Sequence, residues 1–157
     1  FTHFAEHFHE LASMRFGIIG LGNIGRKVAQ IASAFGADVV YYSASHQPPQ
    51  EGYHQVDLDT LLATSDIISI HAPLTVHTQG LINSAALEKM KPSAILLNLG
   101  RGPIVVETDL ANALKKGTIA AAGLDVLSQE PMTDDNPSFP SKTAKSFLLP
   151  PILLGRQ

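Results

Sequence analysis

The sequence contains no cysteine. This absence excludes disulfide bonds, thiolate metal sites and a cysteine nucleophile, and it fits a reducing compartment. No apolar run reaches the roughly 18 residues that span a bilayer, and no basic segment followed by an apolar one forms a secretory signal. The formal net charge of −3 offers no basic surface for nucleic acid or anionic membranes. We therefore expect a cytoplasmic protein whose partners are neither nucleic acids nor membranes.

The sequence contains an ordered alternation of segments that predict strands and segments that predict helices. The 157 residues are the length of one domain, and 45% of them are hydrophobic, enough for a buried core. Apolar runs that predict strands lie at residues 16–20, 38–42, 67–70, 94–98 and 120–124. Segments that predict helices lie at residues 23–35, in a short stretch capped by Asp57, and at residues 83–90 and 107–116. This order predicts an α/β fold: a Rossmann-type, doubly wound parallel sheet with helices on both faces.

Two segments interrupt the alternation. Pro48, Pro49 and Gly52 follow the second expected strand and predict a loop. Residues 138–157 have no clean period, and their apolar run at 147–154 carries two central prolines, which a core strand does not tolerate. We therefore do not expect this last segment to follow the pattern of the rest.

A glycine motif lies between the first expected strand and the first expected helix. It reads Gly20-Leu21-Gly22-Asn23-Ile24-Gly25, the G-x-G-x-x-G pattern. The first glycine permits a tight turn, the second lets a pyrophosphate approach the backbone, and the third lets helix and strand pack closely. The free N–H groups at the helix start, at Asn23 and Ile24, can then hold the phosphates. The motif predicts a dinucleotide site.

The position that usually binds the adenosine ribose is occupied by Ser43. Dinucleotide sites usually carry a carboxylate there, at the end of the second strand. A serine can bond a ribose hydroxyl but cannot repel the 2′-phosphate of NADP, while no arginine or lysine follows in residues 44–47 to attract that phosphate. The sequence therefore favours NAD over NADP as the cofactor.

Three longer segments carry further motifs. Residues 61–74 read LLATSDIISIHAPL, residues 90–105 read MKPSAILLNLGRGPIV, and residues 122–131 read AGLDVLSQEP. With the glycine motif, these segments resemble the D-isomer-specific 2-hydroxyacid dehydrogenase family over residues 10–137. The resemblance implies the NAD-binding domain of an oxidoreductase that transfers a hydride between a nicotinamide cofactor and a D-2-hydroxy acid or 2-keto acid.

The resemblance assigns catalytic roles to two residues. Arg101 follows the fourth expected strand, at the carboxyl edge where doubly wound sheets bind ligands. Its guanidinium can hold the carboxylate and keto oxygen of the substrate in a bidentate way, and a surface ion pair is the alternative. Glu130 resembles the carboxylate that orients a catalytic histidine and raises its pKa, but without the resemblance it would be an ordinary loop carboxylate.

The resemblance also implies cofactor contacts beyond the glycine motif and Ser43. His71, Ala72 and Pro73 resemble the wall of the adenosine pocket, although His71 could instead be a hydrogen-bonded histidine at a strand end. The remaining expected contacts are the pyrophosphate ligand Thr78, the nicotinamide-facing Asp125, and the loop residues Leu99 and Gly100.

By resemblance, this domain is part of a larger, homodimeric parent enzyme. Residues 1–13 resemble a remnant of the helix that links two domains, and residues 14–137 form the dinucleotide-binding domain. Residues 138–157 depart from the family and are expected to be an aberrant tail, compatible with a shifted reading frame. The family's catalytic histidine has no counterpart, because all seven histidines lie at or before His77. We therefore expect little or no turnover from this chain alone.

Three alternatives remain. His3, Glu6 and His7 match the H-x-x-E-H pattern of some zinc peptidases, but no third ligand is evident, so we expect no metal. An NAD-sensing, corepressor-like regulatory protein would have the same cofactor site. A non-functional gene remnant would show neither NAD binding nor cooperative melting.

Overall fold

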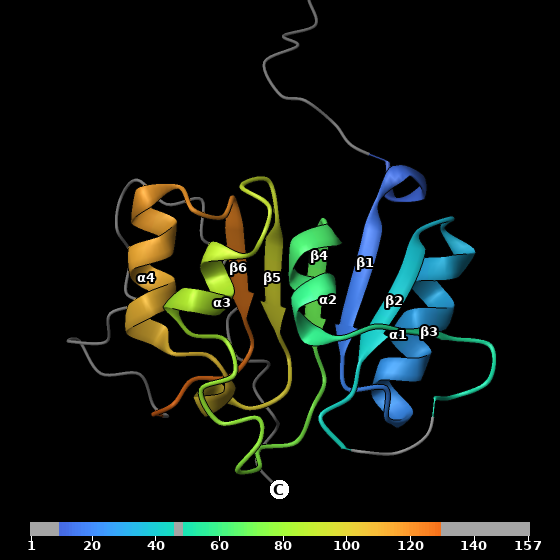
Figure 1. Cartoon of the computed structure of the whole chain (residues 1–157), viewed down its shortest axis with the longest axis horizontal. Helices are drawn as coiled ribbons and strands as arrows, with labels where there is room; N and C mark the ends of the chain where they lie inside the picture. The colour runs from blue at the N-terminus through green and yellow to red at the C-terminus, as the bar shows by residue number, and fades with distance from the viewer. Residues whose placement is uncertain (1–9, 46–48, 130–157) are drawn as a thin grey trace, which may run out of the picture.

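The computed structural model describes residues 10–45 and 49–129. The strands of this part are β1 (Arg15–Ile19), β2 (Asp38–Tyr42), β3 (His54–Gln55), β4 (Ile67–Ile70), β5 (Ile95–Asn98) and β6 (Ala121–Leu124). The α-helices are α1 (Asn23–Ala34), α2 (Leu58–Thr64), α3 (Ser84–Glu88) and α4 (Glu107–Lys116), and two 3-10 helices are η1 (Leu11–Ser13) and η2 (Gly102–Ile104). Figure 1 shows the strands side by side with helices against them.

The strands form one parallel sheet in the order β3-β2-β1-β4-β5-β6. This is the doubly wound order, in which the chain starts in the middle, builds outward to one edge, and then returns to build the other half. The predicted fold is therefore confirmed, and each of the five expected strands is present within one residue of its expected ends.

The sheet has one strand that the sequence did not predict. β3 is only His54 and Gln55, paired in parallel with Val40 and Tyr41 of β2. The sequence of this segment predicts only a loop, because a two-residue strand is too short to show an alternating pattern. Its position at the edge of the sheet is decided by pairing with β2 and not by its own sequence.

Helices cover both faces, as predicted. Ile18 and Ile19 are neighbours in β1 but belong to different buried clusters, because successive residues of a strand point to opposite faces. Ile18 packs with Ala29 of α1, whereas Ile19 lies in the larger cluster that contains Leu61 of α2 and Leu110 of α4. In Figure 1, α2, α3 and α4 lie together in front of the sheet. α1 packs against the opposite face, where Ile18 points.

Local sequence signals determine where the helices begin and end. The Asp57 side chain accepts a hydrogen bond of 2.8 Å from the Thr60 N–H and caps α2, as expected. Asn83 caps α3 in the same way through the Ala86 N–H. Gly36, with a φ of 86°, follows α1 in the left-handed conformation that ends many helices.

Several expectations concern residues outside the described part. These are the linker remnant at residues 1–13, of which residues 1–9 are not described, the zinc pattern at His3, Glu6 and His7, the catalytic Glu130, and the tail at residues 138–157. Within residues 10–45 and 49–129, no group of histidines and carboxylates could hold a metal ion. No helix in this part is long and apolar enough to cross a membrane.

Candidate functional site

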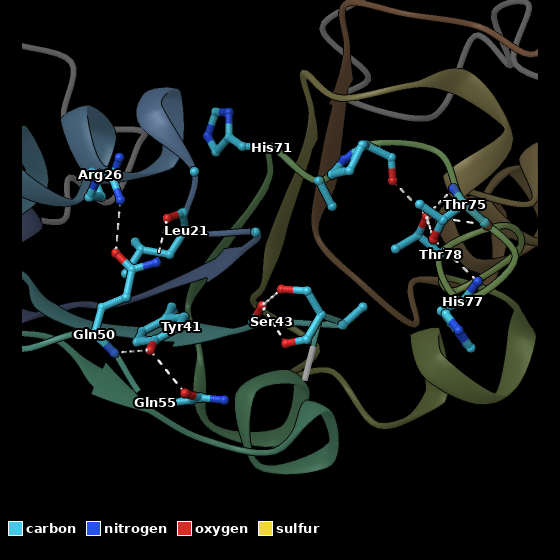
Figure 2. A pocket seen from close by; sticks show the side chains of 16 residues that line it. Leu21, Arg26, Tyr41, Ser43, Gln50, Gln55, His71, Thr75, His77 and Thr78 are labelled. Atoms are coloured by element: carbon cyan, nitrogen blue, oxygen red, sulfur yellow. Dashed lines mark hydrogen bonds between the residues drawn. The ribbon is translucent and has the colours of Figure 1, made fainter. Parts of the chain in front are cut away.

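A cavity of about 410 Å³ opens at the carboxyl ends of the central strands. β1 lies between β2 and β4, so the chain leaves β1 and β4 toward opposite faces of the sheet and a crevice forms between them. Figure 2 shows the 16 side chains that line the cavity, which come from both halves of the sheet. The expected site residues among them are Gly20, Gly22, Ser43, His71, Ala72, Pro73 and Thr78.

Two glycines of the motif make the turn itself possible. Gly20 has a φ of 94°, and a Cβ there would lie 2.7 Å from the Ala72 nitrogen. A Cβ on Gly25 would collide with the Gly20 carbonyl oxygen, so the start of α1 can approach β1 only without a side chain. Both positions thus set the backbone of the turn, as the motif predicted.

Gly22 is different, because a Cβ there would meet no atom within 4 Å. It is the N-cap of α1, and the first N–H that bonds within this helix is that of Arg26, to the Gly22 oxygen at 2.9 Å. The N–H groups of Asn23, Ile24 and Gly25 precede it and have no intrahelical acceptor. No acidic residue lies in this first turn, whereas Glu107 lies in the first turn of α4. The open backbone and the helix dipole fit a pyrophosphate.

His71, Ala72 and Pro73 follow β4 and form one wall of the cavity. The backbone of His71 is tied to β1 through its N–H, which donates to the Ile19 oxygen at 2.8 Å. Its ring nitrogen Nε2 lies 2.9 Å from the Ser69 hydroxyl. Burial lowers the pKa of His71 below its usual value, so the ring is neutral near pH 7.

Thr78 lines the cavity, but its hydroxyl is engaged within its own loop. Oγ1 donates to the Pro73 oxygen at 2.7 Å and accepts from the Thr75 N–H at 2.8 Å. A hydroxyl has a single proton, so this geometry favours a role in shaping residues 73–78. Of the loop's exposed residues, Thr75 and His77 also line the cavity, and the sequence did not indicate either one.

Ser43 lies directly after β2 and lines the opposite wall. Its hydroxyl is 2.8 Å from the Ser45 hydroxyl, so two serines lie together where a carboxylate is usual. The cavity also includes a polar cluster that sequence reasoning missed, formed by Arg26, Tyr41, Gln50 and Gln55. These four, at positions 26, 41, 50 and 55, carry no motif and no periodic spacing, so no sequence signal could have grouped them.

Arg101 lies outside the cavity, on an exposed loop after β5 at the same carboxyl edge. Its Nη1 donates to the Gly100 oxygen at 2.7 Å. The loop is shaped by Asn98, which is fully buried: its Oδ1 accepts from the Gly100 N–H and its Nδ2 donates to the Arg101 oxygen, both at 3.1 Å. Asn98 lies within the motif at residues 90–105, but the sequence does not indicate it as a site residue.

The remaining expected contacts lie on the same edge. Leu99 and Ile24 are exposed apolar side chains, at 42% and 68%. Asp125 is exposed directly after β6, and its N–H donates to the Asn98 oxygen at 3.0 Å. The structure thus places the β5 and β6 loops side by side, while Glu130 is outside the described residues.

Comparisons with known proteins agree with this fold. Residues 2–150 match the family described as "D-isomer specific 2-hydroxyacid dehydrogenase, NAD binding domain". A hydroxypyruvate reductase of Blautia hydrogenotrophica is 46% identical over 135 residues, which are 85% of this chain and 42% of that protein. The chain therefore spans less than half the length of this relative.

Two solved structures are similar over most of the chain. A probable 2-hydroxyacid dehydrogenase from Rhizobium etli, in complex with NADP, HEPES and L(+)-tartaric acid, has a TM-score of 0.82 and 30% identity, covering 94% of this chain and 49% of that one. A D-lactate dehydrogenase with NAD+ from Lactobacillus jensenii has a TM-score of 0.74 and 41% identity, covering 85% and 42%.

Proposed function

Since this chain belongs to the D-isomer specific 2-hydroxyacid dehydrogenase family, as its NAD-binding domain, we propose a reaction for the full-length protein. It reversibly reduces a small 2-keto acid to the D-2-hydroxy acid. The observation that carries the proposal is the open glycine turn at the switch point of the sheet, on the same edge as the Arg101 loop. Relatives named as hydroxypyruvate and glyoxylate reductases favour a short substrate such as one of these two acids.

The chain's own residues bind and orient in this proposal. The backbone N–H groups at Asn23, Ile24 and Gly25 hold the pyrophosphate next to Gly22. Ser43 bonds the adenosine ribose, and residues 71–73 form the adenosine wall. NAD(H), when bound, supplies or accepts the hydride.

The loops after β5 and β6 would hold the nicotinamide end of the cofactor. Asp125 would bind the nicotinamide amide, Leu99 and Gly100 would contact the cofactor, and Thr78 shapes the loop at residues 73–78. Arg101 binds the substrate carboxylate and polarises its keto oxygen through its planar guanidinium. Glu130, outside the described residues, supports the histidine that transfers the proton.

A calorimetric titration of this chain with NAD tests the cofactor site, and an assay of the protein encoded by the intact gene tests the reaction. We expect the full-length protein to oxidise NADH with glyoxylate or hydroxypyruvate, and Arg101→Lys to lose about a hundredfold in kcat/KM because lysine cannot bind bidentately. Binding of NAD by a full-length protein that reduces no 2-keto acid would contradict the proposed reaction. Neither the fold nor the relatives above support a regulatory protein or a gene remnant instead.

We also propose that the full-length protein is a cytoplasmic homodimer. We infer the cytoplasmic location from the amino-acid composition, and cell fractionation tests this location. Ile31 of α1 and Phe35, the C-cap of this helix, are 58% and 64% exposed in this structure, an apolar surface of the kind that subunit contacts cover. Light scattering of the full-length protein would show a dimer, and a monomer at micromolar concentration would contradict this part.

A further inference from the structure

Among the residues that the structure describes, none places a negative charge at the ribose end of the cavity. The side chains that line it include no aspartate or glutamate. Ser43 and Ser45 occupy the end of β2, with their hydroxyls 2.8 Å apart. Nothing among these lining residues would repel a phosphate on the adenosine ribose.

A cation reaches this cavity from α1. Arg26 is half-buried in the first turn of the helix, and its guanidinium donates to the Gln50 Oε1 at 3.0 Å and to the Asn23 Oδ1 at 2.5 Å. Both acceptors are neutral amide oxygens. The ion pairs among the described residues use Arg15, Lys89 and Lys91, so in this part of the chain no carboxylate neutralises Arg26.

Gln50 holds this guanidinium beside the glycine turn. Its Nε2 donates to the Leu21 oxygen at 3.0 Å while its Oε1 accepts from Arg26. Its backbone N–H donates to the Tyr41 hydroxyl at 2.9 Å, and this hydroxyl donates to the Gln55 Oε1. Figure 2 shows this chain of bonds along one wall of the cavity, from Gln55 to Arg26.

We propose that the cavity accepts the 2′-phosphate of NADP as well as the free ribose of NAD, with Arg26 as the phosphate-binding residue and Gln50 as its positioning residue. The inference rests on the cofactor site proposed above. The residues after β2, at positions 44–47, include no arginine or lysine. The fold brings one from the first turn of α1, where its remaining N–H donors can bind phosphate oxygens. NAD also binds, because the Ser43 hydroxyl can form a hydrogen bond with an unmodified ribose hydroxyl.

Binding measurements on this chain test the inference without catalysis. Calorimetry with NAD, NADP and 2′,5′-ADP should give dissociation constants for NAD and NADP within about tenfold of each other, or about 1.4 kcal/mol. Arg26→Gln should weaken the binding of NADP and 2′,5′-ADP by about tenfold or more, because a charge-assisted hydrogen bond is lost. The dissociation constant for NAD should stay within about twofold of the wild-type value. Gln50→Glu, which would pair with Arg26 and repel the phosphate, should have the same selective effect.

Lys27→Gln is the matched control, since it removes one exposed positive charge from the next position of α1. It should change both affinities by no more than about twofold. NAD binding without NADP binding would overturn this inference and leave the proposed function intact. An equal loss of NAD and NADP in Arg26→Gln would show a structural role instead. If neither cofactor binds, the cofactor site proposed above and this inference both fail.

Discussion

Gly20 and Gly22 belong to the same turn, but the structure around the two positions differs. At Gly20 the backbone has a φ of 94° and a side chain would meet Ala72, so the requirement belongs to the folded protein itself. At Gly22 the backbone is extended and the space is open, so the fold itself does not require glycine there, and in the function proposed above the pyrophosphate does.

We predict that alanine separates the two roles. Gly20→Ala should lower the free energy of unfolding by about 1–3 kcal/mol, through backbone strain, and abolish NAD binding. Gly22→Ala should change stability by less than about 1 kcal/mol but weaken NAD by about tenfold or more, because its methyl group occupies the phosphate position. Urea unfolding and calorimetric titration measure both effects. Wild-type NAD affinity in Gly22→Ala would contradict a pyrophosphate at this position.

His71 makes stability depend on pH. Burial lowers its pKa in the folded protein below the usual value of 6.5, so below that pH the unfolded chain binds a proton that the folded protein does not. The unfolded state is then favoured, and stability falls as the pH falls through 6.5. We predict that His71→Gln, which can keep a bond to Ser69 but cannot titrate, loses less stability than the wild type between about pH 7.5 and 5.5. Parallel losses in thermal melts would show that His71 is not responsible.

Among the elements, the loop between β5 and η2 depends on a single buried amide. Asn98 bonds both the Gly100 N–H and the Arg101 oxygen, and it is 0% exposed. The position of Arg101 therefore depends on a residue that does not itself face the cavity.

Asn98→Ala should leave these two backbone groups without their partners. We expect a loss of about 1–3 kcal/mol in the free energy of unfolding, measured in urea. Asn112→Ala is the control, because it makes the same change at an exposed position of α4 and should shift stability by no more than about 0.5 kcal/mol. Equal stability in the two variants would show that the amide does not hold the loop.

At the scale of the whole molecule, the described part contains the cavity at the carboxyl ends of the central strands and the loops beside it. We predict that the 157-residue chain binds NAD but does not reduce glyoxylate with NADH, because no histidine follows His77 to transfer the proton. Absorbance at 340 nm follows the reaction, with a full-length hydroxypyruvate reductase as the positive control. Turnover that depends on Arg101 would show that another group of this chain supplies the proton.

The backbone of the site could be predicted from the sequence. The strand and helix patterns around Gly20, Gly22 and Gly25, and the Asp57 cap, are local signals that each arise within a few residues of one another. Because these local signals give the order of the strands and helices, they also predict the doubly wound fold and the position of Arg101 at the carboxyl edge of the sheet. The roles of Arg101, Asp125 and Glu130 came from family resemblance and stay predictions.

The polar cluster could not be predicted in this way. Arg26 and Gln50 are 24 positions apart, and Tyr41 and Gln55 are 14 apart, so neither pair forms a periodic pattern or a motif. Their bonds exist because the first turn of α1, the end of β2 and residues 50–55 lie together in the folded protein, where β3 also finds its partner strand. Contacts of this kind depend on the positions of whole elements in space, and only the tertiary structure supplies those positions.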